Sequence, residues 1–346
     1  MKMNNLSSPL ISAILSFTLL IPLNTVQASE EIINVYSARK EQLIKPLFDA
    51  FTQQSGIKIN LVTSKGDALL KRLEVEGINS PADILITTDV GRLYRAKEAG
   101  VLQPAITDAL QKQLPVNLRD PERYWLALTT RARVIVYAHD RVNPSELSTY
   151  ENLTDPKWKN RICIRSSNNI YNQSLVSSMI ANKGAQATQD WANGLVNNFA
   201  RKPKGGDRDQ IKAVAAGQCD LAVVNTYYLG QMLNSADDTE TGPAKKVSVF
   251  WPNQADRGTH INVSGVAMTK SSKNKQNGLK LMAFLLSKES QNWYANTNNE
   301  YPVIAGGLVS DTLNNWGTFK SDALNLSELG KHNMEAVRIM DRAGWR

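Results

Sequence analysis

Two tyrosines, Tyr227 and Tyr228, stand side by side where a predicted strand ends and a helix begins. They lie in NTYYLG, with the apolar run 221–224 before them and LGQML after them. Neighbouring strand residues point to opposite faces, so a sheet seldom buries both in one place. A strand-to-helix turn, however, can direct both hydroxyls into one cleft. Tyr171 has a comparable position, because it opens a predicted helix after the polar turn SSNN.

Three phenols that share a cleft can bind a metal ion through their oxygens. A free tyrosine has a pKa of about 10, so only a strongly acidic metal deprotonates several of them at neutral pH. Ferric iron is small, hard and triply charged, whereas zinc prefers histidine and cysteine, and calcium prefers carboxylates and carbonyls. The residues alone leave two other interpretations open: the tyrosines stack on a sugar, or they pack a hinge.

Motifs typical of enzymes do not occur in the sequence. It contains no GxSxG elbow, no phosphate-binding loop, no HExxH and no GxGxxG. His139, His260 and His332 are solitary and lack metal-ligand spacing, so we interpret them as surface or packing residues. We therefore expect a protein that catalyses no reaction.

The first 28 residues have the pattern of a secretory leader. Lys2 precedes an apolar run that Pro22 interrupts, and VQA, which ends at Ala28, fits the small-x-small cleavage pattern. A membrane anchor needs about 20 uninterrupted apolar residues, and no cysteine follows Ala28 for lipid attachment. We expect an exported periplasmic protein that does not insert into the membrane.

The basic charge of the chain is spread along its length. The formal net charge is +8, and removal of the leader lowers it to +7 because the leader carries only Lys2. The lysines and arginines are scattered rather than clustered, and export argues against nucleic acid as a partner. We interpret the excess as a solvated surface with a few arginines inside a site.

The two cysteines have matching positions relative to the tyrosines. Cys163 lies eight residues before Tyr171, and Cys219 lies eight before Tyr227. In an exported chain two cysteines suggest one disulfide, which here would join the bases of two site-forming segments. Two free buried thiols are the alternative.

The order of elements predicts an α/β protein with two lobes and a ligand cleft between them. Alternating strands and helices indicate mainly parallel sheets with helices on both faces. We expect residues 131–138 and 259–270 to cross between lobes, 235–246 to form a surface loop, and 277–295 to form one helix. The expected division is a leader over 1–28, a first lobe over 29–132 and 264–346, and a second lobe over 133–263.

Five segments resemble the ferric-iron-binding proteins of bacterial ABC importers. They are VYSARKEQLIKPLF, ADILITTDVGRLYRAKEAGVLQP, TTRARVIVY, RSSNNIYNQSLV and GQCDLAVVNTYYLG. The similarity covers essentially the whole mature chain, and the pair IYNQS with NTYY is quite specific. It implies a periplasmic protein of the two-lobed, transferrin-like fold that delivers ferric iron to an inner-membrane ABC permease. We expect this protein to be a monomer.

The resemblance assigns the iron ligands to Tyr171, Tyr227 and Tyr228. Some members add a histidine after the first strand, but Arg39-Lys40-Glu41 stands there, and Thr88 stands where others use a glutamate. What remains resembles the branch that completes the site with a carbonate-like synergistic anion. Such an anion would be carbonate or bicarbonate.

The same branch holds its anion with an arginine after the first strand, which corresponds to Arg39, and Arg131 is a second candidate. Iron, three phenolates, carbonate and these two arginines sum to zero charge, which favours burial. We expect four further residues to support the ligand residues without bonding iron themselves: Tyr36, Ser37, Asn169 and Asn225. The alternatives are a binding protein for an oxyanion or a small organic ligand and, less favoured, an exported hydrolase.

Overall fold

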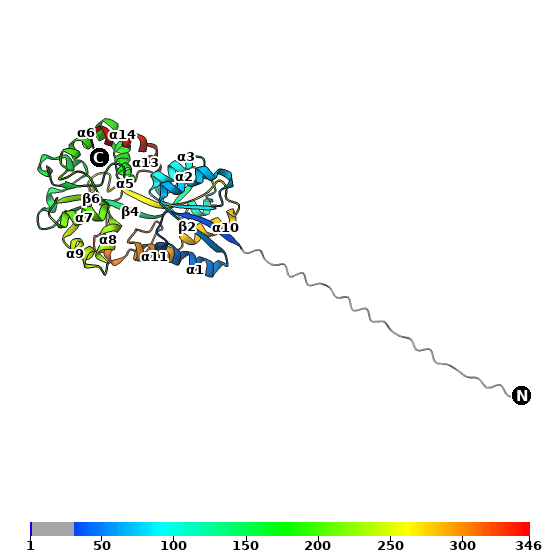
Figure 1. Cartoon of the computed structure of the whole chain (residues 1–346). Helices are drawn as coiled ribbons and strands as arrows, with labels where there is room; N and C mark the ends of the chain where they lie inside the picture. Colours follow the sequence, from blue (N-terminus) through cyan, green and yellow to red (C-terminus); the bar gives the residue numbers. More distant parts are fainter. Residues whose placement is uncertain (2–30) are drawn as a thin grey trace. The chain divides into compact units, whose positions relative to one another are not determined.

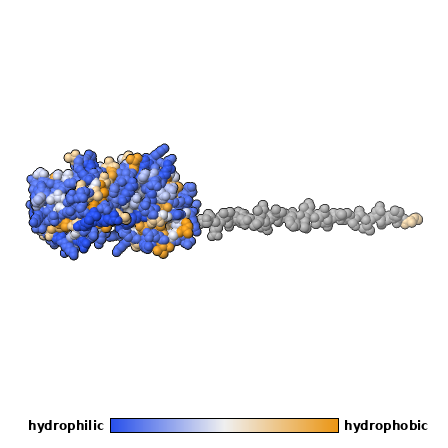
Figure 2. Space-filling model, turned by 90° about the horizontal axis from the view of Figure 1, so that it is seen from above, coloured by the Kyte–Doolittle hydropathy of each residue, from blue (hydrophilic) through white to orange (hydrophobic). Residues whose placement is uncertain are grey.

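The computed structural model describes Met1 and residues 31–346. The predicted leader, from its second residue onward, lies outside the described residues. Among the described helices, none has the length and apolar character that crossing a membrane requires. The face drawn in Figure 2 is mostly hydrophilic, with apolar residues in small groups.

The protein contains an eight-stranded sheet flanked by helices (Figure 1). The strands are β1 (Ile32–Ser37), β2 (Lys58–Thr63), β3 (Ile84–Thr88), β4 (Trp125–Ala138), β5 (Ile162–Cys163), β6 (Leu221–Asn225), β7 (Val247–Phe250) and β8 (Ile261–Met268). The helices are α1 (Lys45–Ser55), α2 (Gly66–Glu76), α3 (Val90–Glu98), α4 (Asp108–Gln111), α5 (Ile170–Lys183), α6 (Ala185–Asn197), α7 (Asp207–Ala215), α8 (Thr226–Leu233), α9 (Asp238–Ala244), α10 (Lys275–Leu285), α11 (Lys288–Asn298), α12 (Asp311–Asn314), α13 (Ser327–Lys331) and α14 (Asn333–Arg342).

The sheet is mixed rather than mainly parallel. Its order is β2-β1-β3-β8-β4-β6-β5, and β7 pairs with β4. The outer strands pair in parallel, β1 with β2 and β3, and β5 with β6. The ladders that involve β4 and β8 are antiparallel. The expectation of mainly parallel sheets is wrong for the middle of the sheet. There β4 and β8 run in opposite directions as the chain crosses the sheet and returns.

Strand β4 changes partners along its length. It pairs with β8 from Trp125 to Ala132, and with β6 from Arg133 to Tyr137. Figure 1 shows β4 extending from the helices α2, α3 and α10 to the helices α5, α6 and α7. The change of partner falls where the sequence predicts that the chain leaves its first lobe. The lobe boundaries themselves stay a prediction.

The C-terminal helix packs with the middle of the chain. Ala336, Ile339 and Trp345 are buried in one cluster with Trp191 and Leu195 of α6. The indole rings of Trp191 and Trp345 meet edge to face, with centroids 6.2 Å apart. Residues 333–345 therefore belong to the packing unit of α5 and α6, although the sequence places them with the first lobe.

Two local expectations are wrong. The expected loop 235–246 contains α9, which begins after Asp237, whose side chain accepts a hydrogen bond from the Thr239 amide. The single helix expected over 277–295 is two helices. Ser287 interrupts it by accepting a hydrogen bond from the Ser290 amide, so that it acts as the N-cap of α11.

The predicted disulfide is confirmed. Cys163 of β5 is bonded to Cys219, which lies just before β6, and their Cα atoms are 5.8 Å apart. Both residues are buried, and β5 and β6 are parallel neighbours. The bridge therefore joins the two strands that lead to the tyrosine-bearing helices α5 and α8.

Candidate metal centre

A cavity of about 200 Å³ contains all three predicted iron ligands. Tyr171, Tyr227 and Tyr228 line it together with the two predicted anion-binding residues, Arg39 and Arg131. Residues from widely separated parts of the chain thus meet as the resemblance implies. Thr88 also lines the cavity, at the position where a glutamate would stand in other members.

The tyrosines come from the first turns of two helices. Asn169 caps α5, and its Oδ1 accepts a hydrogen bond from the Tyr171 amide at 3.1 Å. Tyr227 and Tyr228 follow β6 directly in the first turn of α8. The Oη atoms of Tyr227 and Tyr171 are 3.3 Å apart, and the rings of Tyr227 and Tyr228 lie with centroids 4.3 Å apart. Two oxygens are therefore already close enough to share one small cation.

Tyr227 and Tyr228 are held in their neutral form when no metal is bound. Burial raises the pKa of Tyr227 well above its usual value, and the neighbouring phenols of Tyr171 and Tyr228 raise it further. Burial and the proximity of Tyr171 likewise raise the pKa of Tyr228. A bound cation must therefore supply the free energy of deprotonation, which only a strongly acidic ion does.

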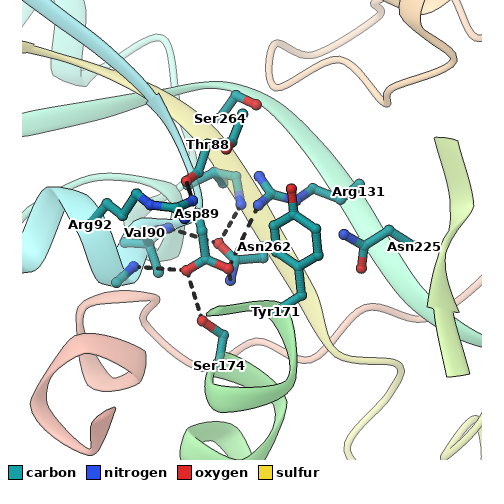
Figure 3. A network of polar contacts seen from close by, with 12 residues as sticks. Thr88, Asp89, Val90, Arg92, Arg131, Tyr171, Ser174, Asn225, Asn262 and Ser264 are labelled. Carbon is teal, nitrogen blue, oxygen red and sulfur yellow. Dashed lines mark hydrogen bonds and ion pairs between the residues drawn. The ribbon is translucent and has the colours of Figure 1, made fainter. Parts of the chain in front are cut away.

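Arg131 is a buried cation with free hydrogen-bonding capacity. Its side chain is 2% exposed, and none of its three guanidinium nitrogens has a hydrogen-bond partner in the part of the chain that the structure describes. The guanidinium lies beside the ring of Tyr171, 5.7 Å from its centroid (Figure 3). Asp89 is 3.8 Å away, beyond hydrogen-bond distance. Buried donors are almost always satisfied, so this guanidinium suits an anion that enters the cavity.

Arg39 already has a partner. Its Nη2 donates to Oε2 of Glu300 at 2.5 Å and to Oγ1 of Thr129 at 3.0 Å, while its amide donates to Oγ of Ser37. Burial lowers the pKa of Arg39, but the Glu300 carboxylate more than offsets this effect and raises it. Glu300 also lines the cavity. The sequence-based charge balance omitted this carboxylate, so the assembly with both arginines sums to −1 rather than zero.

The residues expected to support the ligands, Ser37, Asn225 and Tyr36, have different roles. Ser37 is fully buried and supports the backbone of Arg39. Asn225 accepts from Arg133 Nη1 at 2.9 Å and belongs to a buried network beneath α8. Tyr36 lies apart from the cavity, since its hydroxyl donates to Glu76 and its ring lies under Arg72. It packs in the sheet.

A network that the sequence did not reveal underlies the tyrosines. Arg133 is 2% exposed and bonds Asp207 and Asn172 through its two terminal nitrogens, at 3.2 and 2.6 Å. Arg165 also bonds Asp207, and its guanidinium lies 5.4 Å from the centroid of Tyr171. Nothing in the sequence distinguishes these arginines from the scattered surface ones. Only the fold buries them.

Asp89 joins α3 to α5, the helix that carries Tyr171. It caps α3, and its Oδ1 accepts from the Gly91 amide and from Ser174 Oγ of α5 at 2.7 Å. Its Oδ2 accepts from Asn262 Nδ2 of β8 at 2.9 Å (Figure 3). Asp89 adopts φ +78°, a conformation that costs on the order of 1–3 kcal/mol in a non-glycine residue. These hydrogen bonds hold Asp89 in this conformation of positive φ. They also fix α5 at Ser174, about one turn after Tyr171.

The donor set is dominated by phenols. Among the described residues, no group of three or more His, Cys, Asp or Glu could hold a metal ion. The cavity therefore offers hard anionic oxygens to a cation and guanidinium groups to an anion. A two-lobed α/β fold with such a cavity defines a binding protein.

Comparisons with known proteins agree with this class. Residues 79–321 match the family of bacterial extracellular solute-binding proteins, and the chain belongs to this family. Iron uptake protein A1 of Synechocystis is 46% identical over 94% of this chain and 90% of its own length. The major ferric iron-binding protein of Neisseria meningitidis is 31% identical over 91% of this chain and 93% of its own.

Among solved structures, a Trichodesmium protein in complex with iron and citrate is 48% identical. It superposes with a TM-score of 0.89 over 91% of this chain and all of its own. The predicted two-lobed periplasmic binding protein fold is thereby confirmed.

Proposed function

We propose that this protein binds ferric iron in the periplasm and delivers it to an inner-membrane ABC permease, without catalysing a reaction. Tyr171, Tyr227 and Tyr228 are the iron ligands. The observation that carries the proposal is their convergence in one small cavity, with Oη atoms of Tyr171 and Tyr227 3.3 Å apart. The names of its relatives, an iron uptake protein and a ferric iron-binding protein, support the same cargo.

A carbonate-like anion completes the iron shell in this proposal. Ferric iron and three phenolates cancel in charge, which leaves Arg131 as a buried cation without a hydrogen-bond partner among the described residues. Asp89 lies 3.8 Å away and balances part of this charge, but it does not reach the donors of the guanidinium. An anion on Arg131 satisfies these donors and supplies further oxygens to iron. The carbonate plane matches the planar fork of an arginine.

Delivery requires that iron binding change the conformation of the protein. A ligand shifts an equilibrium only by its differential affinity for the two states. Iron would bond tyrosines of α5 and α8, and its anion would bond Arg131 of β4. Both therefore favour the conformation in which these three elements lie together. The permease then distinguishes the loaded protein from the empty one by this conformation.

The alternative cargo is an oxyanion or a small organic ligand that contacts the arginines directly. The cavity volume of about 200 Å³ is below the roughly 300–1,000 Å³ typical of organic-ligand pockets. Toward an oxyanion the neutral phenols would act only as hydrogen-bond donors.

A visible spectrum separates these functions. Titration of the iron-free protein with a ferric chelate should produce a red to orange charge-transfer band that saturates at one iron per chain. A colourless protein that binds an oxyanion or organic solute with and without iron would contradict the proposal.

A further inference from the structure

Glu300 is held rigidly at the wall of the cavity. It follows α11 directly after Asn299, which adopts the left-handed conformation at φ +52°. The next residue, Tyr301, exchanges two backbone hydrogen bonds with Thr130 of β4, at 2.8 and 2.9 Å. The side chain of Glu300 is 6% exposed. The backbone on both sides therefore fixes where the carboxylate lies.

The same segment is bonded to the helix that carries two iron ligands. Asn234, the residue that follows α8, donates to Oδ1 of Asn299 at 3.1 Å. Gly230 of α8 lies so close that a Cβ there would come within 2.8 Å of the Asn299 side chain. The segment that carries Glu300 is thus held by α8 on one side and by β4 on the other, and Glu300 lines the same cavity as the tyrosines and Arg131.

The Glu300 carboxylate is already bonded to Arg39, one of the two arginines predicted to bind the anion. Its Oε2 accepts from Arg39 Nη2 at 2.5 Å, and its Oε1 accepts from Ser264 Oγ at 3.3 Å. Of the described residues that line the cavity, Glu300 alone carries a carboxylate. In the same cavity, the guanidinium of Arg131 has no hydrogen-bond partner among the described residues. Arg39 therefore has a carboxylate at hydrogen-bond distance, whereas Arg131 has one only at 3.8 Å and keeps its donors free.

We propose that Glu300 is a specificity-determining residue that competes with the iron-associated anion for Arg39. This inference rests on the proposed iron-binding function. Glu300 and Thr129 both accept from Nη2 of Arg39, while its Nε has no hydrogen-bond partner among the described residues, so an anion that bonds Arg39 as well as Arg131 lies beside a buried carboxylate of like charge. Like charges that are brought together out of water repel strongly, and the repulsion grows with the charge of the anion.

The consequence is a preference for small anions of low charge. Bicarbonate carries one negative charge and can use Arg131 alone, while Arg39 remains with Glu300. Citrate carries up to three charges and needs both arginines, so that it opposes Glu300 directly. Removal of the Glu300 charge should therefore strengthen the binding of both anions, and of citrate more than bicarbonate.

The test measures anion binding to the iron-free mature protein by calorimetry. Bicarbonate and citrate are titrated separately into wild type, Glu300→Gln and Glu335→Gln. The glutamine has nearly the same shape, and its amide oxygen can still accept from Arg39. Glu335 is paired with arginines on the surface, so its replacement changes the net charge equally but leaves the cavity intact.

The expected result for Glu300→Gln is an affinity for bicarbonate that is higher by about tenfold, with a larger gain for citrate, because the lost repulsion is taken to equal a pKa shift of about one unit, which is a factor of about ten in affinity. Glu335→Gln should match wild type. Equal or weaker anion binding by Glu300→Gln would overturn the proposal, because it would mean that Glu300 only braces Arg39. If Glu300→Gln fails to fold by circular dichroism, Glu300→Ala is measured in its place with the same expectation.

A ferric titration of the same proteins separates this inference from the proposed function. Wild type that produces no charge-transfer band contradicts iron binding, whatever the anion affinities are. Wild type that binds iron while Glu300→Gln shows no gain in anion affinity contradicts only the role of Glu300.

Discussion

The hydroxyl oxygens of Tyr171 and Tyr227 lie 3.3 Å apart, although the residues are 56 positions apart in the sequence. Cys163 and Cys219 are separated by the same 56 positions and form a disulfide. The bridge therefore joins, eight residues earlier in each segment, the two strands whose helices bring the phenols together. The spacing that related cysteines to tyrosines in the sequence reflects this shared geometry.

Replacement of a ligand tyrosine should abolish tight iron binding without unfolding the protein. Tyr227→Phe, Tyr228→Phe and Tyr171→Phe each remove one anionic oxygen. We expect each to lower ferric affinity by more than about 100-fold, since even the outer partners of a metal site contribute about 10–100-fold. Affinity is measured by competition with a ferric chelator.

Tyr36→Phe is the matched control, because Tyr36 is a buried tyrosine whose hydroxyl bonds Glu76 outside the cavity. It should bind iron as wild type does. Ligand variants that keep wild-type affinity would refute the assignment of the tyrosines.

Iron binding should release protons and weaken in acid. The raised pKa values of Tyr227 and Tyr228 mean that both phenols carry protons at neutral pH in the free protein. Each phenolate that bonds iron releases one proton, so the affinity must fall as pH falls. A pH-stat titration with ferric chelate, corrected for the chelator, should record about one proton per ligand tyrosine, and one fewer in Tyr228→Phe. Identical proton release in the two proteins would exclude Tyr228 as a phenolate ligand.

Arg131 should govern the dependence of iron binding on bicarbonate. In wild type, rigorous removal of bicarbonate should lower ferric affinity, because the shell then lacks its anion. Arg131→Ala should bind iron weakly with and without bicarbonate, and Arg131→Lys should recover only part of the response, since a point charge lacks the planar fork. Arg338→Ala, on the exposed face of α14, controls for net charge. An unchanged bicarbonate response in Arg131→Ala would mean that the anion is held elsewhere.

His260 should make the fold sensitive to acid. Burial, with the nearby charge of Arg133, lowers the pKa of His260 from its usual 6.5 to about 3. Between these two pH values the unfolded chain holds one more proton than the folded chain, so stability falls as pH falls. The slope from this residue is about 1.4 kcal/mol per pH unit.

Urea unfolding at several pH values from about 4 to 6 measures this slope for wild type and His260→Gln, with His139→Gln as the control at an exposed position. His260→Gln should lose the contribution and His139→Gln should keep it. Equal slopes in wild type and His260→Gln would contradict this account of His260.

Much of the fold was predictable because its signals are local. The helix that begins after Asn169 and the strand before Tyr227 follow from capping and apolar runs, and the structure has both. The antiparallel course of β4 and β8 was not predictable, since strand direction depends on which partner the whole chain offers. The packing of Trp345 against Trp191 is a contact of the same long-range kind.

The three tyrosines, Arg39 and Arg131 could be named from the sequence because they stand in motifs. Glu300 could not, because it lies in a polar segment, NTNNEYP, that resembles an ordinary loop. It enters the cavity only because Tyr301 pairs with β4 and Asn299 packs against α8. A burial of this kind depends on contacts between distant segments, and no spacing in the sequence encodes it.

The most direct test of the central claim is anomalous diffraction at the iron absorption edge from crystals of the ferric protein grown with bicarbonate. We expect one strong anomalous peak in the cavity, within direct bonding distance of the hydroxyl oxygens of Tyr171, Tyr227 and Tyr228, with a planar anion between iron and Arg131. An anomalous peak outside this cavity, or one that is not bonded to these three oxygens, would contradict the account.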